Sequence, residues 1–193
     1  LRKGHPVESL VTFLDLVAVA IAADIVPITG ENRILTYFGL KVINSRPRPG
    51  LKALMQGIDR EAYQVSDLVF QLAPRLNAAG RMQHGQQAVS LLTEQDLRSA
   101  LEQAARIESL NQQRKGMDRQ ITEEALAMIR ELGEEGRLST VVYKEDWHKG
   151  VIGIVASRLT ETYYRPTLVF TRSGGKLTAS ARSVRGFDVY QAL

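Results

Sequence analysis

The stretch EQDLRSALEQAARIESLNQQRKGMDRQITEEALAMIREL, residues 94–132, is the most regular part of the chain and divides it into two halves. Apolar residues recur along it at intervals of three and four, which predicts an amphipathic helix with one narrow apolar stripe. A helix of this length spans roughly 60 Å. Gly116 weakens it by about 1 kcal/mol relative to alanine and is a candidate bend, and Gly133 and Gly136 are expected to end it. Because Arg114 interrupts the stripe, we favour an intramolecular connecting helix over a coiled-coil dimer.

Before this stretch, residues 7–28 (VESLVTFLDLVAVAIAADIVPI) are apolar on nearly every side, which predicts a buried helix ended by Pro27. Two aspartates inside such a run need a partner, because a buried carboxylate must be paired or bind a metal. Asp24 lies where the helix gives way to a loop, so it is either a metal ligand or a turn carboxylate. Asp15 lies about 13 Å earlier along the axis, so one metal cannot bind both.

Residues 74–82 (PRLNAAGRM) place two arginines and an asparagine among small residues. Arg75 and Arg81 are six positions apart, so no single face of a helix or strand carries both at the usual short spacings. A bend at the Ala-Ala-Gly segment would bring them together, and with Asn77 they would form an anion site, because two guanidiniums suit a phosphate. The alternative is an interdomain turn whose arginines pair with carboxylates.

Other helices are expected in this first half at residues 33–44, 50–56, 67–72 and 84–92. In the helix over residues 33–44 we expect the apolar side chains, Ile34 and Phe38 among them, to face the core. Ser66 is the expected cap of the helix at residues 67–72.

After Gly136 the pattern changes to alternating strands and helices. Strands are expected at residues 138–143, 167–171 and 176–181, a helix at 151–164, a hairpin turn at 173–175, and a last helix capped by Asp188. This order predicts a sheet covered on one face by helices. The chain as a whole is therefore expected to be mixed α/β, mainly helical first and α/β last.

Ser180 and Arg182 stand two apart at the end of an expected strand, which places both on one face. A hydroxyl and a guanidinium together suit a phosphate, although a plain surface strand end is an equally good interpretation. In the turn before the helix expected at residues 151–164, His148 beside Trp147 is a candidate stacking or acid–base residue, although a histidine in a turn is more often structural.

The composition favours an anionic partner and a reducing compartment. The formal net charge is +4, and residues 137–193 carry nine basic against four acidic side chains, which suggests nucleic acid. There is no cysteine, so disulfides and thiolate chemistry are excluded. No apolar run is long and uncharged enough to span a membrane. The chain starts and stops without turns of its own, so we expect a piece of a longer protein.

Five segments in order, AADIVPITGENR, APRLNAAGRM, WHKGVIGIVASRL, YRPT and SARSVRGFDVYQAL, resemble the RecJ family of the DHH phosphoesterase superfamily. The resemblance covers nearly the whole chain. It implies the C-terminal part of a DHH domain at residues 1–83, connecting helices at 84–136, and the N-terminal part of a DHHA1 domain at 137–193. It also implies a cytoplasmic 5′-to-3′ exonuclease for single-stranded DNA, active in DNA repair and recombination with Mn²⁺ or Mg²⁺. A monomer is expected, and a single-strand-binding protein is a further candidate partner.

The resemblance implies roles for residues at matching positions. Asp24 matches the metal-binding aspartate of the A-D-x-x-P segment. Arg75, Asn77 and Arg81 match R-x-N-A-A-G-R, and Ser180 and Arg182 match the S-x-R that binds the DNA phosphate, expected at its 5′ end.

Parts of the family pattern are missing, because neither a D-H-H pair nor a G-G-H segment is present. We therefore expect an internal fragment without a complete active site, since one aspartate does not hold a catalytic metal. Trp147 or Tyr143 are candidates for stacking on bases. The competing interpretations are an oligonucleotide or cyclic-dinucleotide phosphodiesterase of the same superfamily, and a non-catalytic scaffold that pairs through residues 94–132.

Overall fold

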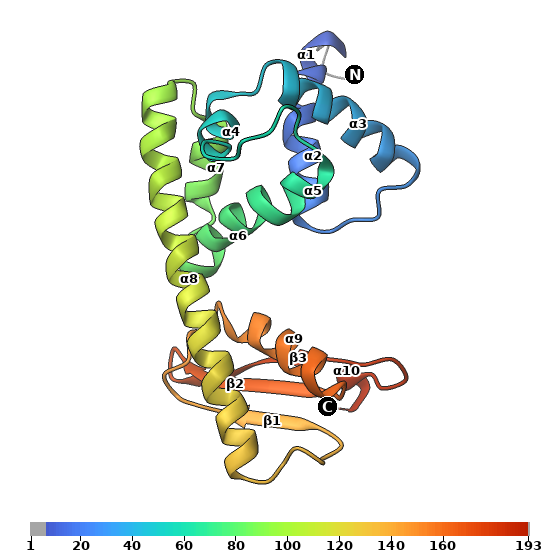
Figure 1. Cartoon of the computed structure of the whole chain (residues 1–193), viewed down its shortest axis with the longest axis vertical. Helices are drawn as coiled ribbons and strands as arrows, with labels where there is room; N and C mark the ends of the chain where they lie inside the picture. The colour runs from blue at the N-terminus through green and yellow to red at the C-terminus, as the bar shows by residue number, and fades with distance from the viewer. Residues whose placement is uncertain (1–6, 193) are drawn as a thin grey trace. The chain divides into compact units, whose positions relative to one another are not determined.

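The computed structural model describes residues 7–192. The chain forms two compact units, one up to Asn111 and one from Gln112 onward. Their boundary falls inside the long helix α8 (Leu97–Glu131), which is the yellow-green helix of Figure 1. The predicted division into residues 1–83, 84–136 and 137–193 stays a prediction. Within residues 7–192, no helix combines the length and apolar character needed to cross a bilayer.

Helix α8 confirms the long helix that the apolar stripe predicts, with 35 residues instead of 39. It begins after Asp96, whose carboxylate accepts a hydrogen bond from the Ser99 N–H at 2.8 Å, the bond of an N-cap. The helix continues without interruption through Gly116, so the expected bend does not break it. Part of the stripe is buried within the chain, for example at Ile107 in the first unit and Ile129 in the second, whereas Leu97 is 37% exposed. The preference for a connecting helix over a coiled-coil dimer stays a prediction.

The described residues of the first unit form helices and connecting loops, with no strand. This unit contains α1 (Val7–Val11), α2 (Leu14–Ala23), α3 (Gly30–Ser45), α4 (Pro49–Leu54), α5 (Val65–Asp67), the π-helix η1 (Leu68–Leu72), α6 (Ala73–Met82), α7 (Gln86–Thr93) and the start of α8. The single helix expected over residues 7–28 is wrong, because the run breaks into α1 and α2 and ends at Ala23. The buried side chains of α2, α3, α4, η1, α6, α7 and α8 form the core.

Helices α2 and α3 pack closely because α3 has a glycine at the contact. A Cβ atom on Gly39 would lie 2.3 Å from the Leu14 carbonyl oxygen, which is far inside van der Waals contact. The core face of α3 therefore runs through Gly39 and Ile43. The sequence-based expectation for Ile34 and Phe38 is wrong, because these side chains are 58% and 48% exposed.

Asp15 is buried and paired, which settles the first of the two aspartates. Its two oxygens accept hydrogen bonds from the Arg48 guanidinium, at 2.6 Å to Nη2 and 2.7 Å to Nε. A two-pronged pair of this kind compensates a buried carboxylate. Asp15 therefore holds the loop before α4 against α2.

The helical run from Val65 to Met82 begins two residues earlier than expected and contains a π turn. Gln64 is the N-cap in place of Ser66, and its N–H donates to the Asp67 carboxylate at 2.9 Å. Hydrogen bonds to the charged form, the one from Gln64 first, lower the pKa of Asp67. η1 then continues directly into α6.

The second unit has a three-stranded sheet of order β1-β2-β3. β1 (Thr140–Tyr143) is parallel to β2 (Thr167–Ser173), with α9 (Ile152–Tyr163) between them in the chain. β2 pairs antiparallel with β3 (Lys176–Arg182), and the hairpin turn at Gly174 and Gly175 uses positive φ at both residues. The short helix α10 (Val189–Ala192) follows. These elements confirm the predicted mixed α/β organisation.

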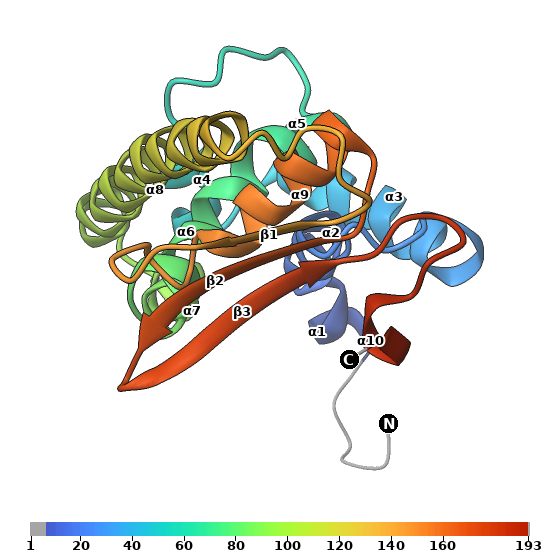
Figure 2. The same ribbon diagram turned by 90° about the horizontal axis from the view of Figure 1, so that it is seen from below.

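Helix α9 covers one face of the sheet (Figure 2). Register places Val142, Val169 and Ser180 beside one another across the sheet, and Val142 and Val169 are buried. Alternation turns Tyr143 and Ala179 to the opposite face, where Tyr143 is 42% exposed.

Candidate nucleic-acid interface

Asp24 lies at the C-terminal end of α2, on an exposed turn. The turn closes through two hydrogen bonds, from the Ile25 N–H to the Ala22 carbonyl at 3.3 Å and from the Val26 N–H to the Ile21 carbonyl at 3.1 Å. This is a Schellman motif, with isoleucine at the position that glycine usually takes. The φ of Ile25 is 53°, an unfavourable value for a β-branched residue. This motif, rather than Pro27, ends the helix.

Asn77 joins α6 to this turn. Its side-chain Nδ2 donates to the Ala23 carbonyl at 3.4 Å, next to Asp24 in the chain. Arg81 is four residues later on the same helix and is exposed. Residues four apart lie on one face of a helix. The structure therefore places Asp24, Asn77 and Arg81 in one region of the first unit.

Arg75 belongs to a different face, because residues 73–82 form one uninterrupted helix. The expected bend at the Ala-Ala-Gly segment is therefore wrong, and it does not bring Arg75 to Arg81. The Arg75 guanidinium donates to the Leu54 carbonyl, and its Nε lies 3.0 Å from Glu108. It thus ties α6 to α4 and α8, as the alternative interpretation of paired arginines predicts for this residue.

Ser180 and Arg182 face α9 together, as the period-two rule predicts. The Arg182 guanidinium donates to the Gly153 carbonyl and to the Ser157 hydroxyl, both at 2.8 Å, and to the Ser180 hydroxyl at 3.3 Å. Gly153 makes the approach possible, because a Cβ atom there would lie 3.1 Å from Ser180 Oγ and 3.4 Å from Arg182 Nη2. A hydroxyl and a guanidinium therefore meet beside the first turn of α9, and the positive charge of the guanidinium suits an anion.

His148 shapes the start of α9. Its carbonyl accepts hydrogen bonds from the N–H groups of Val151 and Ile152, at 2.9 and 3.2 Å. Its ring Nδ1 accepts one from the Gly150 N–H at 3.1 Å. The residue therefore has a structural role, and its acid–base role stays a prediction.

The structure argues against the stacking role predicted for Trp147, and the one predicted for Tyr143 stays a prediction. Trp147 is 4% exposed and offers no ring face to a base. Its indole N–H donates to Glu124 at 2.8 Å. Tyr143 is exposed but lies on the sheet face opposite to Ser180 and Arg182, so it cannot stack a base held by those two residues.

Glu124 is a residue that the sequence reasoning missed. It lies on α8 and also accepts hydrogen bonds from Lys144 and Gln120, both at 2.9 Å. These bonds, with that of Trp147 the largest, lower the pKa of Glu124 from 4.5 to about 2. Glu124 thus fixes the loop that leads into α9. The feature that could have signalled it is a carboxylate close to the apolar stripe of a helix.

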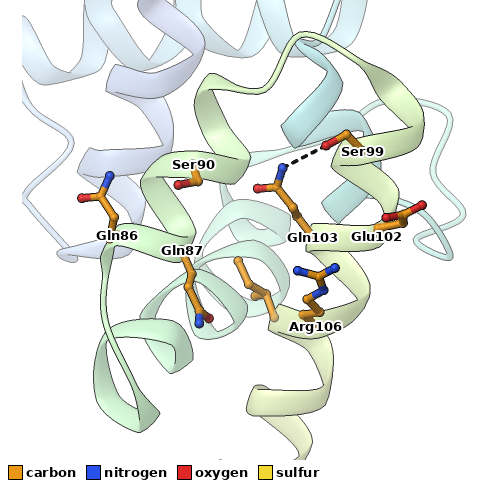
Figure 3. A pocket seen from close by; sticks show the side chains of 8 residues that line it. Gln86, Gln87, Ser90, Ser99, Glu102, Gln103 and Arg106 are labelled. Carbon is orange, nitrogen blue, oxygen red and sulfur yellow. Dashed lines mark hydrogen bonds between the residues drawn. The ribbon is translucent and has the colours of Figure 1, made fainter.

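The polar pocket in Figure 3 lies in the first unit between α7 and α8, with a volume of about 380 Å³. Glutamine and serine side chains line much of it, and Gln103 donates to Ser99 at 3.2 Å. Glu94 accepts hydrogen bonds from both, at 2.9 and 2.7 Å. None of the predicted site residues lines this pocket.

The described residues do not form a complete metal site. Within residues 7–192, no three His, Cys, Asp or Glu side chains gather as a metal would require. Asp24 is exposed, and its carboxylate is able to supply one oxygen ligand to Mg²⁺ or Mn²⁺. One carboxylate does not make a catalytic metal centre.

Comparison with known proteins gives consistent matches. Residues 137–193 match the DHHA1 domain. The chain is 40% identical over 192 residues to the single-stranded-DNA-specific exonuclease RecJ of Salmonella typhimurium, covering 96% of this chain and 33% of that protein. It is 41% identical over 184 residues to RecJ of Bacillus subtilis, covering 93% of this chain and 23% of that protein. The chain thus spans a third or less of the length of these relatives.

Solved structures agree. The structure of RecJ from Thermus thermophilus in complex with Mg²⁺ matches with a TM-score of 0.84 and 27% identity, over 99% of this chain and 29% of that chain. A structure of exonuclease RecJ bound to manganese matches with a TM-score of 0.84 and 28% identity, over 99% and 47% of the two chains.

Proposed function

We propose that this chain contributes to a 5′-to-3′ exonuclease for single-stranded DNA. The reason is that it belongs to the RecJ family and carries a DHHA1 domain at residues 137–193. In this proposal the second unit holds a DNA phosphate through Ser180 and Arg182. The first unit supplies Asp24 as one ligand of Mn²⁺ or Mg²⁺, with Asn77 positioning its turn and Arg81 binding the DNA backbone. Arg75 holds α6 against α4 and α8.

The observation that carries the proposal is the convergence of Ser180 and Arg182 on the first turn of α9. Phosphate contacts of this kind position a strand without reading its sequence. A phosphate also compensates a guanidinium whose other hydrogen bonds go only to neutral groups. The proposed preference is for the phosphate at the 5′ end.

Binding of short oligonucleotides to the chain tests this assignment. We expect Ser180→Ala to weaken binding of a 5′-phosphorylated thymidine hexamer by about fivefold, because one hydrogen bond contributes about 1 kcal/mol. Gly153→Ala should weaken it at least as much by displacing both Ser180 and Arg182. Ser173→Ala removes a hydroxyl from the same hairpin and is the matched control. A hexamer with a 5′ hydroxyl should bind all four proteins equally. Equal binding of the phosphorylated hexamer to the parent chain and Ser180→Ala would contradict the assignment.

We expect no digestion of DNA by these 193 residues, because Asp24 is alone as a metal ligand. Metal-dependent release of nucleotides by the purified chain, abolished by Asp24→Asn, would refute that expectation. Hydrolysis of a cyclic dinucleotide under the same conditions would favour a phosphodiesterase.

The proposed setting follows from the substrate. We place the activity in DNA repair and recombination, in the cytoplasm, with the chain as a monomer on single-stranded DNA. A single-strand-binding protein is the proposed accessory partner, and gel filtration of the two proteins together tests it.

A further inference from the structure

We propose a second phosphate subsite in the second unit, a cationic pocket between α8 and α9 that binds the backbone of a nucleic-acid strand beyond its first phosphate. The pocket has a volume of about 510 Å³. Four cationic side chains line it, three from α8 and one from α9: Arg114, Lys115, Arg119 and Arg158. The inference rests on the proposed function, because it extends the strand held by Arg182.

Arg158 is fixed in place by a buried partner. Asp118 is 3% exposed and accepts hydrogen bonds from Arg158 Nε at 2.9 Å and Nη2 at 2.8 Å. These bonds raise the pKa of Arg158 and hold its guanidinium plane in one orientation. Half of the side chain remains exposed, so Arg158 is a positioned cation at the pocket rather than a mobile surface one.

The spacing of Lys115 and Arg119 does not stabilise the folded chain. They are exposed and four residues apart on α8, and like charges at this spacing destabilise a helix by a few tenths of a kcal/mol. The lining has four cations against two carboxylates, Asp118 and Glu123, and the pairing of Asp118 with Arg158 cancels one charge of each sign and leaves three cations against one carboxylate. The excess positive charge favours an anionic ligand.

The position of the pocket on α9 indicates that its anionic ligand is a later phosphate of the strand held at Arg182. Ile154 lines it and is the residue after Gly153, whose carbonyl binds Arg182. Adjacent residues are turned by about 100° around a helix, so the two sites lie on neighbouring sides of α9. The helix is about 10 Å wide with its side chains, and a stacked strand advances about 3.4 Å per nucleotide. A strand anchored at Arg182 therefore reaches the pocket about three nucleotides later.

The experiment compares a 5′-phosphorylated thymidine dinucleotide with a hexamer, measured by fluorescence anisotropy on the whole chain over a range of salt. The test variants are Arg119→Gln and the double variant Lys115→Gln/Arg119→Gln. Arg130→Gln is the matched control. It is exposed on the same helix and, eleven residues further on, points to the same side about 16 Å away. Both test variants should fold, because they remove a like-charge pair.

We expect the double variant to bind the hexamer several tens of times more weakly at about 50 mM salt, with the slope of log K against log salt reduced by about 1.4, or 0.7 for each phosphate contact. Dinucleotide binding should not change, and Arg130→Gln should match the parent chain.

A double variant that keeps the full preference for the hexamer overturns the pocket while leaving the site at Arg182 in place. Equal weakening of dinucleotide and hexamer also overturns it. A parent chain that binds the hexamer through the pocket but not the dinucleotide supports the pocket and overturns the site at Arg182, and binding of neither overturns both.

Discussion

Glu124 gives the sharpest test of how the second unit is held together. The substitution Glu124→Gln keeps the size and one acceptor oxygen of the side chain but removes the charge that Trp147 and Lys144 contact. The lowering of its pKa from 4.5 to about 2 corresponds to roughly 3 kcal/mol at about 1.4 kcal/mol per unit. The side chain is 28% exposed, so we expect a loss of about 2 kcal/mol at pH 7 after solvent screening.

The pH dependence has a definite direction. A carboxyl with a lowered pKa in the folded state stabilises fully above its unfolded pKa, here 4.5, and this stability is lost as the pH falls toward about 2. The stability of the parent chain should therefore approach that of Glu124→Gln as the pH falls through this range. At pH 7 the two should differ most.

The assay uses the protein's own fluorophore. Trp147 is the one tryptophan of the chain and is buried in the second unit, so its fluorescence during urea unfolding reports that unit. Glu123→Gln, which removes the neighbouring exposed carboxylate, is the control and should change stability by less than about 0.5 kcal/mol. Equal stability of Glu124→Gln and the parent chain at pH 7, or a difference that persists below pH 2, would refute the reasoning.

Three further predictions concern the fold and are measured by urea or thermal unfolding followed by circular dichroism. Gly116→Ala should stabilise the chain by up to about 1 kcal/mol, because its Cβ would meet open space within α8; a destabilised variant would contradict the uninterrupted helix. Gly39→Ala should destabilise the first unit by about 1–3 kcal/mol, because the new Cβ collides with the Leu14 carbonyl; unchanged stability would disprove the close approach of α2 and α3. Arg48→Leu should cost about 3–5 kcal/mol, because Asp15 stays buried without its partner, whereas a small effect would show that the carboxylate reaches water.

Patterns local in sequence predicted most of the fold. The stripe over residues 94–132 predicted α8, because apolar spacing within one helix depends only on that helix. The same holds for β2, β3 and their Gly174-Gly175 turn, whose conformation the residues themselves favour. The period-two spacing correctly put Ser180 and Arg182 on one face.

What the sequence could not predict depends on partners distant in the chain. Asp15 pairs with a residue 33 positions away, and Trp147 with a residue 23 positions away, so neither environment is visible locally. The Ala-Ala-Gly segment suggested a bend, but tertiary packing favours the helix over the flexibility of small residues. Arg75 also has partners that are distant in the chain. It matches a family motif, but its side chain contacts α4 and α8.

The isoleucine at position 25 ties two properties of the first unit together. Its left-handed backbone costs about 1–2 kcal/mol relative to glycine, and its side chain is 78% exposed, so little packing repays that energy. A glycine there would relax the turn but would also free the adjacent carboxylate to sample more directions. If Asp24 is a metal ligand, as proposed, the stability of the turn and a fixed direction of its carboxylate are opposing demands on Ile25.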